Sequence, residues 1–192
     1  MIADECMTGF GKTGKWFAME HWNVAPAIIT FAKGVSSGYL PMGGVILSDQ
    51  VQRHVFFDDN GEKKKFKHDY TFASHATCCA VALKNLEILE RENLVEQCRE
   101  KGFQFLKLLM DRLSNLSVVK DVRGAGLLLG IELHRDDVAT DIEKRMLKEE
   151  KIVVHAAMNG KVIDLAPSFV TSQEQFEQIA NGLFNVLRQY SE

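Results

Sequence analysis

The sequence predicts an α/β protein, in which a mostly parallel sheet with helices is followed by a small α+β domain. Short apolar runs near the N-terminus each lead into a polar residue and a glycine-containing loop. Two long stretches with helical spacing come next, and short strands then precede a final amphipathic helix. We place the domain boundary inside the second long helix, which gives domains 1–105 and 106–192.

A short strand over residues 1–5 ends in Asp4 and Glu5, and the glycines of residues 8–14 predict a loop after it. Residues 28–31 form a second apolar run, which leads directly into Lys33. Because ligand crevices form at strand ends in α/β sheets, we expect both carboxylates to face the same crevice edge as Lys33.

A third strand is expected over residues 45–48, and Asp49 is expected to cap a short helix that runs to residue 55. Two amphipathic helices then start near residues 76 and 94. Their apolar stripes, expected in the core or in a subunit interface, are Ala76, Cys79, Ala80, Leu83 and Leu86 on the first helix, and Leu94, Cys98, Phe105, Leu109 and Leu113 on the second.

The second half of the chain predicts a small strand-rich domain. Strands over residues 118–123 and 126–133 form a hairpin, and a helix follows near 138–150. Two short strands are expected at 152–155 and 162–165. The last helix carries an apolar side made of Phe176, Ile179, Ala180, Leu183, Phe184, Leu187 and Tyr190.

Composition excludes several classes of function. With 192 residues, 46% of them hydrophobic and 26% charged, the chain is an ordinary globular protein, and its net charge of -3 argues against a nucleic-acid partner. No apolar run approaches the roughly 18 residues of a membrane span, and no signal peptide is evident, so a cytoplasmic protein is expected. The four cysteines lack a CxxC spacing, so reduced thiols and no metal site are expected.

Residues 9–15 fit most of the phosphate-loop pattern GxxxxGK, which would make the protein a nucleotide-binding one. The position that should hold magnesium through Ser or Thr is Trp16, and no clear helix starts there. We therefore interpret the match as accidental.

Lys33 has two interpretations from the residues alone. A lysine held at a strand end beside a glycine-rich turn loses hydration, which can lower its pKa and make it a Schiff-base nucleophile. Most strand-terminal lysines instead point into water while the stem packs. Only the neighbouring residues can decide between these two.

Several motifs together resemble the class III aminotransferases, which are pyridoxal 5'-phosphate (PLP) enzymes of fold type I. They are Ile2-Ala3-Asp4-Glu5, residues 8–14, Ala32-Lys33-Gly34, Tyr70-Thr71-Phe72 and Val122-Arg123-Gly124-Ala125-Gly126-Leu127. The resemblance covers nearly the whole chain. It implies the C-terminal part of the PLP-binding large domain followed by a small domain, and the turn after Lys33 is most similar to the ω-amino acid:pyruvate branch.

The resemblance also implies roles for three residues. Lys33 would form the Schiff base with the cofactor aldehyde and then move the proton during transfer. Asp4 would pair with the pyridinium nitrogen and keep it protonated. Thr71 would contact the cofactor phosphate from the neighbouring subunit, which implies a homodimer with shared active sites.

Three positions depart from the family pattern or leave alternatives open. Cys6 stands where the family usually has a valine that packs on the ring, and Met7 stands where several members have a glutamine near the ring hydroxyl. Arg123 matches an arginine that meets a substrate carboxylate in ornithine-type members, but a structural arginine in the hairpin is an equal alternative.

The implied function is transfer of an amino group from an amine or ω-amino acid to a keto acid such as pyruvate. The alternative is a non-catalytic fragment or dimerisation module, because the resemblance leaves the helix N-terminus that cradles the cofactor phosphate outside this sequence. Because part of the large domain also lies outside this sequence, we expect the sheet to have exposed edges.

Overall fold

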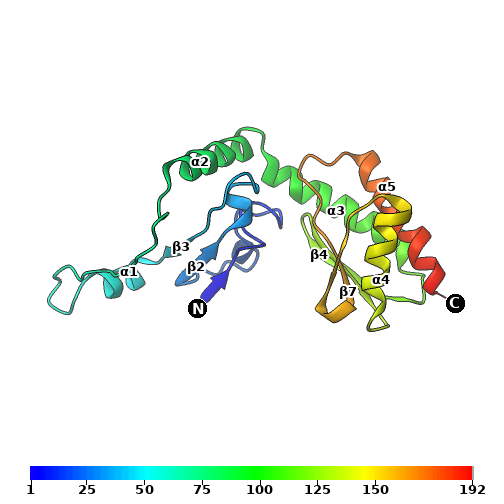
Figure 1. Ribbon diagram of the computed structural model, residues 1–192, viewed down its shortest axis with the longest axis horizontal. Helices are drawn as coiled ribbons and strands as arrows, with labels where there is room; N and C mark the ends of the chain where they lie inside the picture. Colours follow the sequence, from blue (N-terminus) through cyan, green and yellow to red (C-terminus); the bar gives the residue numbers. More distant parts are fainter. Residues whose placement is uncertain (192) are drawn as a thin grey trace. The chain divides into compact units, whose positions relative to one another are not determined.

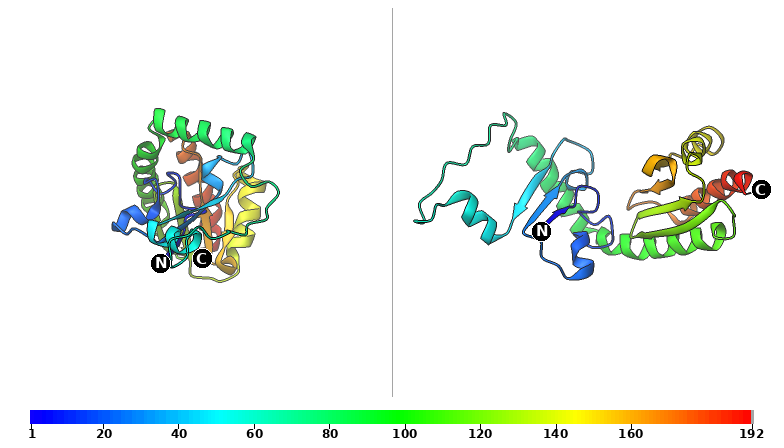
Figure 2. Two further views of the ribbon diagram at one scale, coloured as in Figure 1. Left: turned by 90° about the vertical axis from the view of Figure 1, so that its left-hand side faces the viewer. Right: turned by 90° about the horizontal axis from the view of Figure 1, so that it is seen from below.

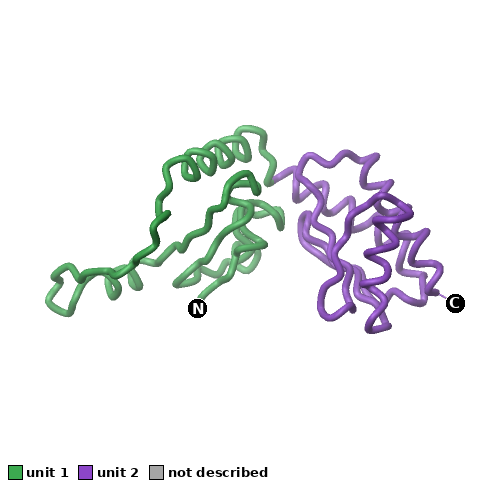
Figure 3. The backbone as a smooth tube through the Cα atoms, viewed as in Figure 1, with its two compact units in different colours: residues 1–95 green, residues 96–192 purple. Residues whose placement is uncertain are grey.

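The computed structural model describes residues 1–191. The chain forms two compact units, of which the first spans Met1–Val95 and the second begins at Glu96 (Figure 3). This division lies near the start of helix α3 (Leu94–Leu113), whereas the expected boundary at residues 105 and 106 lies within the same helix.

A three-stranded sheet organises the first unit (Figure 1). Strand β1 (Ile2–Asp4) pairs in parallel with β2 (Ile28–Phe31), and β3 (Gly44–Leu47) pairs with β2 in the antiparallel direction. Since β1 and β2 are parallel, their carboxyl ends lie at the same edge, and Asp4 is directly opposite Thr30.

Four helical segments belong to this unit. They are the 3₁₀ helices η1 (Ala18–Trp22) and η2 (Lys33–Val35) and the α-helices α1 (Asp49–Phe56) and α2 (Ala76–Arg91). The cap of α1 differs from the expected one, because the Ser48 hydroxyl, and not Asp49, accepts the hydrogen bond from the Val51 amide.

The apolar stripe expected on α2 is not part of a core in this structure. The buried residues of helix α2 are Ala82 and Leu89, which lie outside the expected stripe. Leu83, which belongs to the stripe, is 68% exposed. The free face includes part of the stripe that the sequence assigned to a core or a subunit interface.

An antiparallel sheet with the strand order β4-β5-β7-β6 organises the second unit. The predicted hairpin is confirmed, since β4 pairs with β5. The elements are β4 (Val119–Ala125), β5 (Leu128–Leu133), α4 (Val138–Arg145), the π-helical turn η3 (Met146–Glu150), β6 (His155–Ala157), η4 (Met158–Gly160), β7 (Val162–Leu165), α5 (Gln173–Leu187) and η5 (Arg188–Tyr190). The strand expected at residues 152–155 begins later, at His155.

The core of the second unit joins the buried face of β5 and β7 to the apolar sides of α3, α4 and α5 (Figure 2). Alternation along β5 buries Leu129, Ile131 and Leu133. The stripe expected on α3 is buried as predicted. The helix packs closely, because a Cβ added at Gly102 would lie 2.1 Å from the Gly126 carbonyl oxygen in the β4–β5 turn.

Candidate active site

Asp4 is held at the end of β1 by two donors. Its Oδ1 accepts a hydrogen bond of 3.0 Å from the Cys6 amide and another of 3.0 Å from the Thr30 hydroxyl. Hydrogen bonds from Cys6 and from Thr30, together with the positive charge of Lys33, hold the pKa of Asp4 below its ordinary value. The carboxylate is therefore ionised at neutral pH and suited to a cationic N–H donor.

Lys33 lies two residues after the end of β2, at the first position of η2. Its backbone has a φ of +41°, a left-handed conformation that is unusual for a residue with a Cβ. The Lys33 charge makes the smallest contribution to the low pKa of Asp4, and both residues lie at the shared edge where β1 and β2 end.

Cys6 joins this group through its thiol. The Cys6 sulfur is 3.8 Å from the Thr30 hydroxyl oxygen, and hydrogen bonding to Asp4 raises the pKa of the thiol. Cys6 is therefore a neutral thiol at physiological pH. Met7, by contrast, is 54% exposed.

Glu5 does not face the crevice, which corrects the expectation for this carboxylate. Neighbouring residues of a strand point to opposite sides, and Glu5 is only 2% exposed. Its oxygens accept hydrogen bonds from the Thr8 hydroxyl and, at 2.9 Å each, from the amides of Ala18 and Met19. Glu5 thus fixes the loop after β1 to the start of η1.

Asn85 of α2 is a site residue that the sequence pattern did not reveal. Its amide donates to the carbonyls of Gly34 at 2.9 Å and Val35 at 3.0 Å, and its oxygen accepts from the Ser37 hydroxyl at 2.6 Å. These three bonds hold the turn that follows Lys33. Asn85 is some 50 residues away from this turn along the chain, so no local sequence pattern connects them.

The other predicted site residues lie elsewhere. Thr71 is exposed in the turn that precedes α2, and Arg123 is on β4 of the second unit. Arg123 forms ion pairs with Asp121 at 2.8 Å and with Glu132 at 2.6 Å. These two ion pairs favour the structural interpretation of Arg123.

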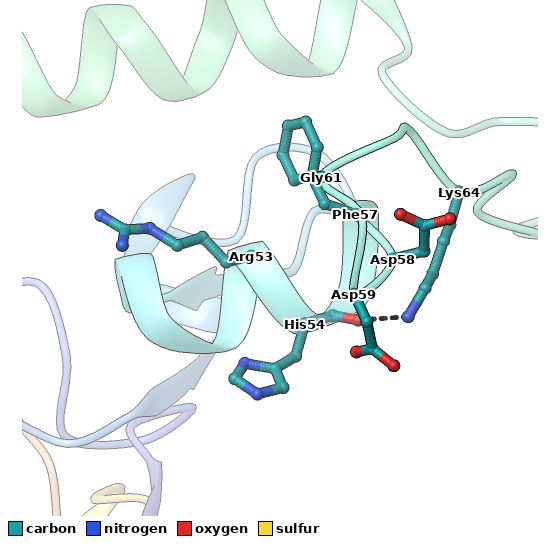
Figure 4. Close-up of a pocket in the computed structure, with 7 residues that line it drawn as sticks. All are labelled: Arg53, His54, Phe57, Asp58, Asp59, Gly61 and Lys64. Atoms are coloured by element: carbon teal, nitrogen blue, oxygen red, sulfur yellow. Dashed lines mark hydrogen bonds between the residues drawn. The ribbon is translucent and has the colours of Figure 1, made fainter.

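Two cavities lie in the first unit. One of about 490 Å³ is formed by the end of α1 and the loop after it, where the Lys64 ammonium reaches the His54 carbonyl oxygen and Arg53 points away from them (Figure 4). Another of about 920 Å³ is lined mainly by residues 40–45 and 68–79. Neither lining includes Asp4 or Lys33.

The phosphate-loop interpretation fails on geometry. The Phe10 amide donates to the Trp16 carbonyl oxygen at 2.6 Å, so the loop closes on itself. The next helical segment is η1, which is short and begins only at Ala18, and it cannot offer the long helix N-terminus that such a loop requires.

The family model described as Aminotransferase class-III matches residues 1–187. The chain belongs to the class III aminotransferases. These enzymes depend on PLP, and an ionised aspartate beside a strand-end lysine is chemically suited to that cofactor.

The relatives of this class III chain are aminotransferases. It is 34% identical over 189 residues to the diaminobutyrate–2-oxoglutarate transaminase of Halomonas elongata, covering 93% of this chain and 40% of that protein. It is 32% identical over 196 residues to the taurine–pyruvate aminotransferase of Bilophila wadsworthia, covering 95% and 43%.

Solved structures give the same picture. An aminotransferase from Bacillus anthracis matches with a TM-score of 0.87 and 33% identity, covering 98% of this chain and 44% of that one. The (S)-enantioselective ω-transaminase from Thermomicrobium roseum matches with a TM-score of 0.87 and 33% identity, covering 100% and 43%. This class III chain therefore spans less than half of the length of these relatives.

No helix among the described residues of this class III chain is both long and apolar enough to cross a membrane. The four cysteines, all in the described part, form no disulfide.

Proposed function

We infer that the chain supplies the lysine and the aspartate of a PLP-dependent transaminase that moves an amino group from an amine or ω-amino acid to a keto acid such as pyruvate. One observation carries this proposal. The ionised Asp4 carboxylate and the Lys33 amine lie at the carboxyl ends of two adjacent parallel strands, close enough for the lysine charge to lower the pKa of the aspartate.

Each residue has a chemical task in this function. PLP, when bound, accepts the electron pair that the substrate carbon leaves behind as it loses its proton. Asp4 would accept a hydrogen bond from the pyridine N–H and keep it protonated. Lys33 would hold the cofactor through its amine and, once replaced by the substrate amine, would carry the proton away from the substrate carbon.

The other proposed site residues concern recognition of the cofactor and the substrate. Cys6 would pack against the ring beside Asp4, with Met7 close by, and Thr71 would reach the phosphate in the neighbouring subunit of a homodimer. Support for a pyruvate acceptor comes from the taurine–pyruvate relative. The diaminobutyrate relative is named for 2-oxoglutarate, so comparing both acceptors tests this part.

The assignment of Lys33 is tested by reduction with borohydride in the presence of PLP. Peptide mapping should find the cofactor on Lys33, because this amine alone would form the reducible bond in the site. Lys33→Arg should abolish this label, whereas Lys84→Arg, at an exposed lysine of α2, should leave it unchanged. Labelling at another lysine in the unaltered chain would contradict the assignment.

The second candidate is a non-catalytic fragment or dimerisation module. It is favoured by the coverage of about 40% of the relatives and by the exposed sheet residues Ile2 and Val45. An absorbance titration of the chain with PLP separates the two candidates. Saturable binding at micromolar PLP supports the enzyme site, and the absence of saturation supports the module.

A further inference from the structure

Thr30 touches the proposed catalytic machinery without belonging to any motif. It lies on β2 directly opposite Asp4, and its hydroxyl donates to Asp4 Oδ1 at 3.0 Å. The Cys6 amide donates to the same oxygen at 3.0 Å. Both donors thus bond to Oδ1, and Oδ2 keeps lone-pair capacity to accept a hydrogen bond from a ligand.

The two donors differ in what they can fix. The Cys6 amide follows Asp4 in the same strand end, so it moves with Asp4. The Thr30 hydroxyl belongs to the neighbouring strand and therefore ties the carboxylate to the sheet. Threonine is stiff at χ1 because its Cβ is branched, so the hydroxyl is presented in one direction.

The hydroxyl proton of Thr30 fixes the direction of its hydrogen bond to Asp4. A threonine hydroxyl has a single hydrogen, and Asp4 Oδ1 receives it. The Cys6 sulfur lies 3.8 Å from the Thr30 hydroxyl oxygen, and hydrogen bonding to Asp4 raises the pKa of the thiol. The Cys6 thiol and the Thr30 hydroxyl thus both act on the Asp4 carboxylate.

We propose that Thr30 is a positioning residue that sets the orientation and the ionisation of Asp4, so that Oδ2 faces the pyridine N–H of the cofactor. This proposal rests on the proposed function, because the cofactor gives Oδ2 its ligand. The groups that act on Asp4 are Thr30 and Lys33 from the β2 side and Cys6 from its own strand end. Glu5 faces the opposite side of β1 and takes no part.

The test measures Asp4 directly and needs no cofactor. The carboxyl carbon of Asp4 is followed by ¹³C NMR from pH 2 to pH 7 in the full chain without PLP. Thr30→Val removes the hydroxyl at nearly constant shape, so the titration midpoint of Asp4 should move upward. Thr30→Ser restores the donor and should bring the midpoint back toward that of the unaltered chain.

Two further variants make the measurement decisive. Thr30→Ala also lacks the hydroxyl and replaces Thr30→Val if the valine variant does not fold. Thr8→Val is the matched control, because its hydroxyl donates to Glu5 and not to Asp4, and it should leave the midpoint unchanged. An unchanged midpoint in the variants that lack the Thr30 hydroxyl, or an equal rise in Thr30→Ser, would overturn the proposal.

A second readout links the hydrogen bond to the cofactor. In the PLP-loaded chain, the pH midpoint of the visible absorption should shift in Thr30→Val and return in Thr30→Ser, and a midpoint that stays constant overturns the cofactor part of the proposal. Failure of borohydride labelling at Lys33 refutes the proposed function by itself. The carboxyl titration still reports on Thr30 in that case, so the two failures are distinguishable.

Discussion

Asp4 shows how a surface-accessible carboxylate is kept charged by its immediate neighbours. Hydrogen bonds from Cys6 and Thr30 and the Lys33 charge all favour the ionised form, and they lower the pKa of Asp4. The pKa in the folded chain is thus below the ordinary value of about 3.9. Ionised Asp4 therefore stabilises the folded chain above that pH, and this stabilisation is lost as the pH falls through the lowered pKa.

Asp4→Asn should consequently reduce stability in a pH-dependent way. The asparagine keeps an oxygen acceptor but lacks the charge that its donors and Lys33 prefer. Urea unfolding should show the variant less stable than the unaltered chain at pH 6, with a difference that shrinks toward pH 3. A difference that grows as the pH falls would contradict the direction of the pKa shift.

The residues of the site were predictable to different degrees. The strand-end positions of Lys33 and Asp4 could be predicted from the apolar runs before them, whereas their proposed roles come from the family resemblance. Thr30 could not, since its role depends on the register of β1 against β2. Glu5 was expected at the crevice edge beside Lys33 but is buried on the other side of β1. The position of two adjacent carboxylates at a strand end does not show which of them faces the crevice.

Among the elements, α3 is fixed to the β4–β5 turn by the absence of a side chain at Gly102. Alanine in an exposed helix would stabilise the chain by about 1 kcal/mol relative to glycine. Here the added Cβ would lie 2.1 Å from the Gly126 carbonyl oxygen, so Gly102→Ala should destabilise the chain by about 1–3 kcal/mol.

Urea denaturation followed by circular dichroism checks the sign of this change. Gln104→Ala, at an exposed position of the same helix, is the matched control and should be neutral within about 0.5 kcal/mol. A more stable Gly102→Ala variant would contradict this prediction, because it would show that α3 and the β4–β5 turn can move apart without loss of stability.

Helix α2 acts on the Lys33 turn through Asn85. Asn85→Ala should remove the side-chain donor of the Gly34 and Val35 carbonyls and loosen the turn. The amides of Val35 and Ser36 should then exchange with deuterium roughly tenfold faster, since a lost hydrogen bond costs about 1–1.5 kcal/mol. Lys84→Ala, one position earlier on the exposed side, should leave the exchange rates of these amides unchanged.

Element types could be predicted better than element environments. The strands and long helices follow from their periodicity, and the final helix buries the expected Phe176 and Leu183. The stripe on α2 was assigned to a core or an interface, and the exposure of Leu83 excludes the core within this chain. Periodicity identifies an apolar face, but it does not identify the surface that covers it.

At the scale of the whole molecule, the first unit exposes apolar sheet surface. Ile2 is 66% exposed and Val45 is 56% exposed, so apolar side chains of both outer strands are uncovered. The relatives have more than half of their length outside the matched region. The outer strands β1 and β3 each have one edge without a partner strand among the described residues.

A shared active site predicts complementation between two inactive chains. Lys33→Ala removes the lysine, and Thr71→Val removes the phosphate contact that would serve the partner. In mixed dimers one site would receive both intact residues, so the mixture should bind PLP more tightly than either variant alone. Absorbance titration checks this, and binding equal to the average of the two variants would show that Thr71 acts within its own subunit or not at all.

The backbone of Lys33 has one more consequence. At a φ of +41° a side-chain-bearing residue is strained by roughly 1–2 kcal/mol, and glycine would adopt the same conformation without strain. A glycine would relieve this backbone strain, but it would also remove the amine and its charge beside Asp4. Backbone strain and chemistry therefore oppose each other at this single residue.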